Sequence, residues 1–104
     1  MNISKEQIGA FSKKWKIATF SIFGSVARGE ETPTSDVDVL VDFLPTAHWT
    51  LFNLVDMRDE LIKIFGRKVD LVTLNGIKNS SNPIRKNSIL TSAKVVYEQG
   101  SGLH

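Results

Sequence analysis

The sequence has no cysteine, no long apolar run and no strong excess of either charge. The absence of cysteine excludes disulfide bonds, thiolate metal sites and a cysteine nucleophile. No segment approaches the roughly 20 consecutive apolar residues that a membrane-spanning helix needs. Thirteen lysines and arginines against 11 acidic residues give a net charge of +2, which is no direct sign of nucleic-acid binding. What remains, 41% hydrophobic and 23% charged residues, is ordinary for a soluble globular protein.

The length of 104 residues predicts one domain with a single hydrophobic core. We expect residues 1–99 to form this domain and residues 100–104 to be a loose tail. The first five residues lack the apolar run of a secretory signal peptide, so a cytoplasmic location is the expectation.

Apolar periodicity and turn residues predict alternating helices and strands. Helices are expected at 5–15, 49–65 and 84–93, strands at 17–23, 36–42, 68–74 and 94–98, a short helical turn at 25–29 and a polar connection at 75–83. The order α-β-β-α-β-α-β indicates an α/β (α+β) fold, with helices packed on one sheet. Because the link between the first two strands is short, they can be antiparallel, so a mixed sheet is expected.

The longest expected helix, residues 49–65, has one apolar face and one charged face. The apolar face consists of Leu51, Leu54, Val55, Leu61, Ile62 and Phe65. The charged residues Asp56, Asp59 and Glu60 are expected to face water. Three further apolar residues, Trp49, Phe52 and Met57, lie off this face or at its edge, and would either pack in the core or form a contact surface.

Two carboxylates, Asp36 and Asp38, are separated by one valine in a valine-rich strand. Residues i and i+2 of a strand point to the same face, about 6.5–7 Å apart. Unpaired, they would repel each other, so they suggest a cation held between them. The alternative is that the pair simply faces water. Asp42, near the end of the same strand, is interpreted as a solvated residue.

A third carboxylate, Asp70, interrupts the apolar strand at 68–74. Buried strands rarely hold an isolated carboxylate unless it is paired or ligates a metal. Acids from two strands that converge at one end of a sheet would supply the oxygen ligands that Mg²⁺ prefers. Asp36, Asp38 and Asp70 are therefore the candidate metal-ligating and catalytic residues.

Gly24 and Ser25 follow the first expected strand and precede Asp36 by a ten-residue interval. A glycine at a strand end lets the backbone come close to a ligand, and a short helix from Ser25 would direct N–H groups at an anion. Arg28, one turn further along, would reach a phosphate oxygen. The alternative for Arg28 is an ion pair with Glu30 or Glu31. A metal site beside an anion site suggests nucleotide phosphates.

The segment 24–29, followed by 35–41, resembles the G-S-x10-D-x-D signature of the DNA polymerase β-like nucleotidyltransferase superfamily. The short length and the spacing resemble its minimal nucleotidyltransferases, the MNT family. The segments 82–86 and 95–98 are also similar to the way these small proteins end. The resemblance covers most of the chain and implies the nucleotidyltransferase fold.

The resemblance also implies roles for the three acids. Asp36 and Asp38 would hold two Mg²⁺ ions, of which one grips a nucleoside triphosphate and the other activates the attacking hydroxyl. Asp70 would ligate the second ion and help to orient or deprotonate that hydroxyl.

Four further residues of the motif receive roles in nucleotide binding from the same resemblance. Gly24 and Ser25 would hold the β- and γ-phosphates. Arg28 and Ser35 would support the phosphates or the loop.

The activity implied by the resemblance is transfer of a nucleoside monophosphate, expected to be AMP from ATP, to a hydroxyl. The chain has no room for an acceptor-binding domain, so the acceptor site would come from a partner or from a second copy in a homo-oligomer. The family likeness implies a small helical HEPN protein as that partner, and a role as the antitoxin of a HEPN/MNT toxin–antitoxin pair. The alternative is an antitoxin that neutralises its partner by contact alone.

Overall fold

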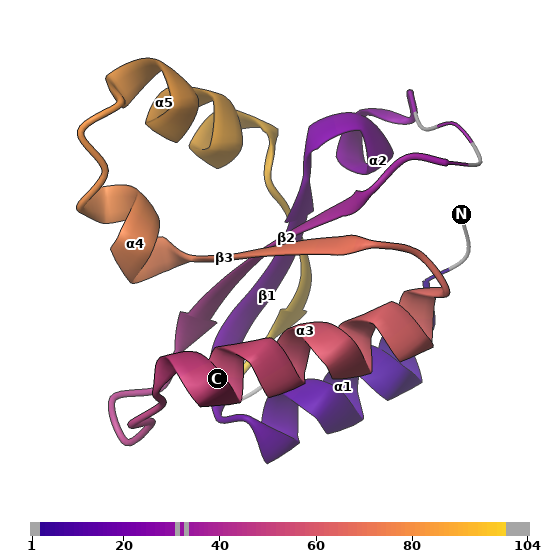
Figure 1. Cartoon of the computed structure of the whole chain (residues 1–104), viewed down its shortest axis with the longest axis vertical. Helices are drawn as coiled ribbons and strands as arrows, with labels where there is room; N and C mark the ends of the chain where they lie inside the picture. The colour runs from indigo at the N-terminus through magenta and orange to yellow at the C-terminus, as the bar shows by residue number, and fades with distance from the viewer. Residues whose placement is uncertain (1–2, 31, 33, 100–104) are drawn as a thin grey trace.

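The computed structural model describes residues 3–30, 32 and 34–99, which form a four-stranded sheet with helices on both faces (Figure 1). The elements in chain order are α1 (Lys5–Lys14), β1 (Ile17–Phe23), α2 (Gly24–Arg28), β2 (Val37–Phe43), α3 (Leu51–Phe65), β3 (Val69–Thr73), α4 (Leu74–Lys78), α5 (Pro83–Ser92) and β4 (Lys94–Glu98). The tail expected at 100–104 lies outside the described residues. Within the described part of the chain, the helices are all too short or too polar to cross a membrane.

The sheet has the strand order β3-β2-β1-β4, so β2 is central and β3 is an edge strand. β1 runs antiparallel to both β2 and β4, whereas β2 and β3 are parallel. The expected mixed sheet and the antiparallel pairing of the first two strands are confirmed. A parallel pair needs a long crossover, and α3 supplies it between β2 and β3.

One expected connection is wrong, because the polar segment at 75–83 contains most of the helix α4. The Thr73 hydroxyl accepts a hydrogen bond from the Gly76 N–H at 3.1 Å, which caps this helix at its start. Ile77 is buried against Leu40 and Ile89. A single buried apolar residue in a five-residue helix gives too little periodicity to predict the element from the sequence.

The larger core lies between the sheet and the helices α1 and α3, which run side by side below it in Figure 1. Its buried residues include Ile8 and Phe11 of α1, Phe20 and Ile22 of β1, Val37, Val39 and Val41 of β2, and Met57 and Leu61 of α3. A smaller core, Phe23, Leu40, Ile77 and Ile89, lies on the opposite face under α4 and α5. Because side chains alternate along a strand, Asp38 lies on the same face as Leu40, the face that α4 and α5 cover.

The face of α3 that packs in the core overlaps the expected one but is not identical to it. Of the expected residues, Leu61 is fully buried, and Leu54, Ile62 and Phe65 pack against the core. Leu51 and Val55 are 78% and 48% exposed, whereas Met57 is fully buried. Trp49 is also part of the core: its ring packs edge-on against Trp15 at 5.2 Å, and its Nε1 donates to the Trp15 carbonyl. The apolar residues of α3 fit two adjacent helical faces, and only contact with α1 and the sheet selects one of them.

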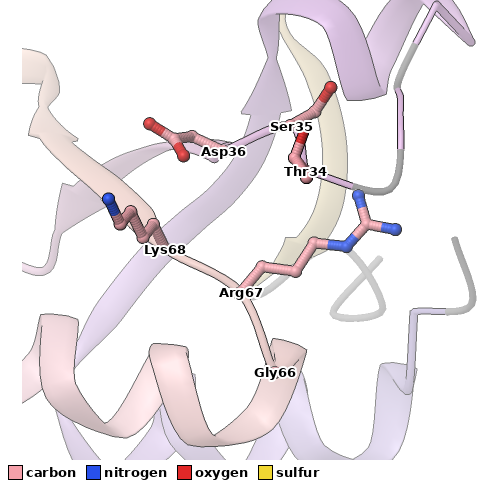
Figure 2. A pocket seen from close by; sticks show the side chains of 6 residues that line it. All are labelled: Thr34, Ser35, Asp36, Gly66, Arg67 and Lys68. Carbon is pink, nitrogen blue, oxygen red and sulfur yellow. The ribbon is translucent and has the colours of Figure 1, made fainter.

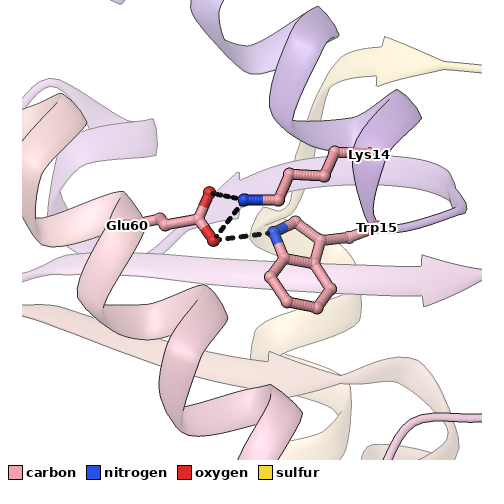
Figure 3. Close-up of polar contacts among 3 residues, drawn as sticks. All are labelled: Lys14, Trp15 and Glu60. Atoms are coloured by element: carbon pink, nitrogen blue, oxygen red, sulfur yellow. Dashed lines mark hydrogen bonds and ion pairs between the residues drawn. The ribbon is translucent and has the colours of Figure 1, made fainter.

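Glu60 does not face water as expected but joins α3 to α1 (Figure 3). Its carboxylate accepts from Lys14 Nζ at 3.0 Å to each oxygen, and from Trp15 Nε1 at 3.2 Å. These bonds fix the two helices of the larger core against each other, on the face of the sheet away from Asp38.

Candidate functional site

Asp38 and Asp70 lie directly opposite each other on the parallel strands β2 and β3. Neighbouring strands are about 4.8 Å apart, and residues in register point to the same face. Asp36 immediately precedes β2, two residues from Asp38. The structure therefore brings the three sequence-predicted carboxylates to one end of the β2–β3 pair.

These carboxylates line a pocket of about 380 Å³ at the β3 edge of the sheet. The other lining residues are Arg58, Ile62, Lys68 and Val69. Arg58 comes from α3 and Lys68 from the residue before β3, so cationic side chains border the acids on this side. The pocket combines acidic ligands with basic groups that suit an anionic substrate.

Gly24 lies against the carboxylate of Asp38. Phe23, the last residue of β1, pairs with Asp38 across the antiparallel ladder, which brings the start of α2 to this point. A Cβ on Gly24 would lie 2.2 Å from Asp38 Oδ2, and the residue has a φ of +73°. Both the backbone conformation and the space exclude a side chain here. The sequence analysis expected the backbone at Gly24 to approach a ligand. In the structure, the neighbour of this glycine is the carboxylate of Asp38.

Asp38 is the electrostatic centre of the site. Partial burial raises its pKa, and the nearby charges of Asp70 and Asp36 raise it further. The guanidinium groups of Arg28 and Arg85 oppose this rise. Because the three carboxylates repel one another, a cation that binds between them would stabilise the charged form of Asp38.

Asp70 differs from expectation in its surroundings. Its strand is an edge strand, and its side chain is 53% exposed, so burial does not force it to pair. Its place opposite Asp38, rather than isolation in a buried strand, makes it a candidate ligand.

The donor set fits Mg²⁺ in chemistry and charge, since all three groups are hard oxygen ligands that repel one another. Among the described residues, however, no three acidic or histidine side chains are close enough to enclose a metal as they stand. Binding would therefore require the carboxylates of Asp36, Asp38 and Asp70 to turn toward a shared ion.

Arg28 forms an ion pair with Glu30, the alternative that the sequence left open. Its side chain is also half exposed, and its charge reaches Asp38. Ser25, the second residue of α2, lies directly after the glycine that contacts Asp38. Arg28 and Ser25 are thus beside the acids, at the positions where the sequence predicts a phosphate turn.

Ser35 stabilises the loop before β2. Its hydroxyl accepts from the Thr32 N–H at 2.7 Å, and its own N–H donates to the Thr32 carbonyl at 3.0 Å. Arg67 Nη1 donates to the same carbonyl at 3.2 Å. Ser35 was expected to support either the phosphates or the loop. In the structure its hydrogen bonds support the loop.

A second pocket, of about 370 Å³, adjoins the acids (Figure 2). It is lined by Thr34, Ser35, Asp36, Gly66, Arg67 and Lys68. In the close-up, the Lys68 side chain extends on the Asp36 side of this pocket, and Arg67 extends toward the loop that holds Thr34. Because Asp36 and Lys68 line both pockets, the two are continuous around the start of β3.

The sequence interpretation missed Arg85. Its Nη2 lies 4.0 Å from Asp70 Oδ2, and α5 carries it to the same face of the sheet as the acids. A signal was present: Arg85 stands in the first turn of a helix, where the macrodipole disfavours a cation. Such a placement indicates a role other than helix stability. Arg58 and Lys68, which border the acids, were missed as well.

Comparison with known proteins gives a match to one family model and to several relatives. The family model described as "Nucleotidyltransferase domain" matches residues 4–96. MJ0435 of Methanocaldococcus jannaschii, which carries the name of a protein adenylyltransferase, is 39% identical over 95 residues, covering 89% of this chain and 96% of the relative.

Two solved structures share the fold. One, a toxin–antitoxin with AMP-PNP, has a TM-score of 0.72 at 17% identity and covers 92% of this chain and 74% of that chain. The other is a tri-AMPylated Shewanella oneidensis HEPN toxin in complex with an MNT antitoxin. It has a TM-score of 0.63 at 18% identity and covers 90% of this chain and 69% of that chain. At these identities the likeness is one of fold.

Proposed function

The chain belongs to the nucleotidyltransferase domain family, as one of its minimal members, and we propose that it is active as an enzyme of this kind. With Mg²⁺ bound, it would transfer AMP from ATP to a hydroxyl of a partner protein. One observation carries the proposal. Asp38 lies in register with Asp70 on one side and against the backbone of Gly24 on the other. A cation site and a phosphate turn are thus adjacent, as transfer from a nucleoside triphosphate requires.

Asp36, Asp38 and Asp70 would hold two Mg²⁺ ions. When bound, such ions stabilise charge on the attacking and leaving oxygens of an in-line displacement. The rise in the pKa of Asp38 is in part a consequence of crowding among these carboxylates, and divalent cations would relieve that repulsion.

The start of α2 would bind the β- and γ-phosphates. The absence of a side chain at Gly24 allows the Asp38 carboxylate to lie against the start of α2, and Ser25 would offer its N–H and hydroxyl to a phosphate beside that carboxylate. Arg28 would leave its ion pair with Glu30 to form a charge-assisted hydrogen bond with a phosphate oxygen. Ser35 would keep the loop before Asp36 in place.

Asp70 would orient the acceptor hydroxyl and accept its proton. Its position on the edge strand, with more than half of its side chain exposed, leaves it accessible to a group on another protein.

The partner proposed is a helical HEPN-type toxin, with this chain as its antitoxin. The support is the fold likeness to toxin–antitoxin structures, one of which contains an AMPylated HEPN toxin. The chain also offers an apolar surface on α3, where Leu51, Phe52 and Val55 are exposed. The sequence analysis considered three apolar residues for a contact surface. Phe52 is 84% exposed and available for such a contact, whereas Trp49 and Met57 belong to the core.

A second candidate function is neutralisation by contact alone. The exposed apolar surface of α3 favours it, because such a surface would bind a partner whether or not the acids act. The two functions differ in their dependence on Asp36 and Asp38.

The test is to incubate the protein with labelled ATP, Mg²⁺ and the protein encoded beside it. Label should appear on that neighbour, and should be lost in Asp36→Asn/Asp38→Asn. Asp59→Asn, which removes a carboxylate from the exposed face of α3, is the matched control and should retain transfer. Neutralisation that survives the double substitution, with no transfer by the wild type, would leave only the contact function.

A further inference from the structure

We propose that Arg85 is a positioning residue that exchanges partners: it neutralises Asp70 before a divalent cation binds, and afterwards binds a phosphate oxygen of the nucleotide. This inference rests on the proposed function, because it concerns the same acids and the same nucleotide. It assigns a role to α5, which the motif at 24–38 does not include.

The first observation is the ion pair itself. Arg85 Nη2 lies 4.0 Å from Asp70 Oδ2, and the two side chains are 57% and 53% exposed. An exposed pair at this distance is weak, so a divalent cation can replace it at little cost. Among the described residues, Asp70 is the one carboxylate within ion-pair distance of Arg85.

The second observation is that a hydrogen bond holds the backbone of Arg85 in place, whereas its side chain lies largely in solvent. The Asn82 side chain caps α5 by accepting from the Arg85 N–H at 3.1 Å. The guanidinium extends from this anchored position toward the acids and is more than half exposed. Such a residue can swing between two partners without any movement of its helix.

The third observation is that Arg85 stands where helix electrostatics disfavour it. It is the third residue of α5, and the positive end of the helix dipole repels a guanidinium there. The same helix end favours an anion. A nucleotide phosphate would therefore be attracted to this end of α5 both by the arginine and by the helix.

Arg85 and Arg28 together border the acids from two helices. Both guanidinium groups act on the carboxylate of Asp38, one from α2 and the other from α5. Arg28 pairs with Glu30, whereas Arg85 pairs with an acid that a metal would take. A divalent cation at Asp70 would repel Arg85, and the phosphates that arrive with the nucleotide would attract it.

The exchange predicts effects of opposite sign on two affinities. In Arg85→Ala, Mn²⁺ should bind the nucleotide-free protein about threefold more tightly, because a competing cation is gone. ATP in the presence of Mg²⁺ should bind about tenfold more weakly, because a charge-assisted hydrogen bond is lost. A merely structural role would weaken both.

The experiment measures Mn²⁺ affinity by electron paramagnetic resonance and ATP affinity by calorimetry, on wild type, Arg85→Ala, Arg85→Lys and Lys63→Ala. Arg85→Lys keeps the charge but not the planar fork, so it should bind Mn²⁺ like the wild type and ATP with intermediate affinity. Lys63 is an exposed cation on α3 that lines neither of the two pockets beside the acids, and its removal should change neither affinity. Equal thermal unfolding of the variants shows that the fold is intact.

Mn²⁺ affinity that is unchanged or weaker in Arg85→Ala would overturn the exchange, as would unchanged ATP affinity. A wild type that binds Mn²⁺ and ATP but transfers no label would count against the proposed function and leave the exchange standing. Wild-type protein that binds neither would overturn both.

Discussion

The carboxylate of Asp38 fills the space that a side chain on Gly24 would need, because a Cβ there would lie 2.2 Å from Asp38 Oδ2. The two residues are close because Phe23 and Asp38 pair across the β1–β2 ladder. The glycine of the proposed phosphate turn and an acid of the proposed cation site thus lie in direct contact. A change in one must move the other.

Gly24→Ala should therefore destabilise the protein and disable the site together. The positive φ alone costs about 1 kcal/mol for alanine, and displacing the Asp38 carboxylate adds to this. Denaturant unfolding should show a loss of about 2 kcal/mol or more, and Mn²⁺ binding should weaken.

The matched control for this change is Gly66→Ala. Gly66 has nearly the same φ, +69°, and a methyl group added there would have no neighbour within 4 Å among the described residues. The free energy of unfolding of Gly66→Ala should fall only by the cost of a positive φ in alanine, and the variant should bind Mn²⁺ like the wild type. Equal losses in the two variants would mean that the contact with Asp38 has no energetic effect.

The raised pKa of Asp38 gives the metal-free protein a defined dependence on pH. Because the folded-state pKa lies above its ordinary value of 3.8, the folded protein holds the proton more tightly than the unfolded chain does. The contribution of Asp38 to stability should therefore fall as the pH rises from below 3.8 through the folded-state pKa. Asp38→Asn should remove this contribution and should make the metal-free protein more stable than the wild type at pH 7.

Thermal unfolding with and without Mg²⁺ measures this effect. The wild type should gain melting temperature when Mg²⁺ is added, and Asp38→Asn should gain much less. Asp42→Asn, further along the same strand, is the control and should behave like the wild type. A difference in stability between the wild type and Asp38→Asn that stays constant as the pH rises across this window would contradict the electrostatic account.

Glu60 should contribute to stability and not to activity. Glu60→Gln removes the charge that holds Lys14 and weakens the bond from Trp15 Nε1. Denaturant unfolding should show a loss of about 1 kcal/mol. Nucleotide affinity should stay unchanged, because Glu60 lies on the opposite face of the sheet from Asp38. The control Asp59→Asn, on the exposed side of the same helix, should change neither quantity.

Phe52→Asp should weaken partner binding without affecting the isolated protein. Phe52 is 84% exposed, so the substitution removes little buried area, and the melting temperature should stay within a few degrees. If α3 provides the contact, the affinity for the neighbouring toxin should fall at least about tenfold, as is usual for a central aromatic contact. Val95→Asp replaces an exposed apolar residue of β4, at the other edge of the sheet, and should leave binding intact. Normal binding by Phe52→Asp would place the partner on a different surface.

The candidate site residues could be proposed from local sequence because each of them lies in a short segment with a clear pattern. Asp36 and Asp38 alternate with valines, and Gly24 ends an apolar strand, so the sequence shows both the face and the turn. Asp70 was predicted for a partly wrong reason, since its strand is exposed at the sheet edge rather than buried. Arg85 could not be placed, because its proximity to Asp70 depends on how α5 packs back over the sheet.

The sequence by itself determined the order of most elements, the mixed character of the sheet and the identity of the three acids, because these depend on periodicity and on residue chemistry over a few positions. Only the tertiary structure decided which face of α3 is buried, that β3 is an edge strand, and that Gly24, Arg85 and Asp70 meet around Asp38. These features join segments that are far apart in the chain. They follow from packing and strand register, which no local pattern specifies.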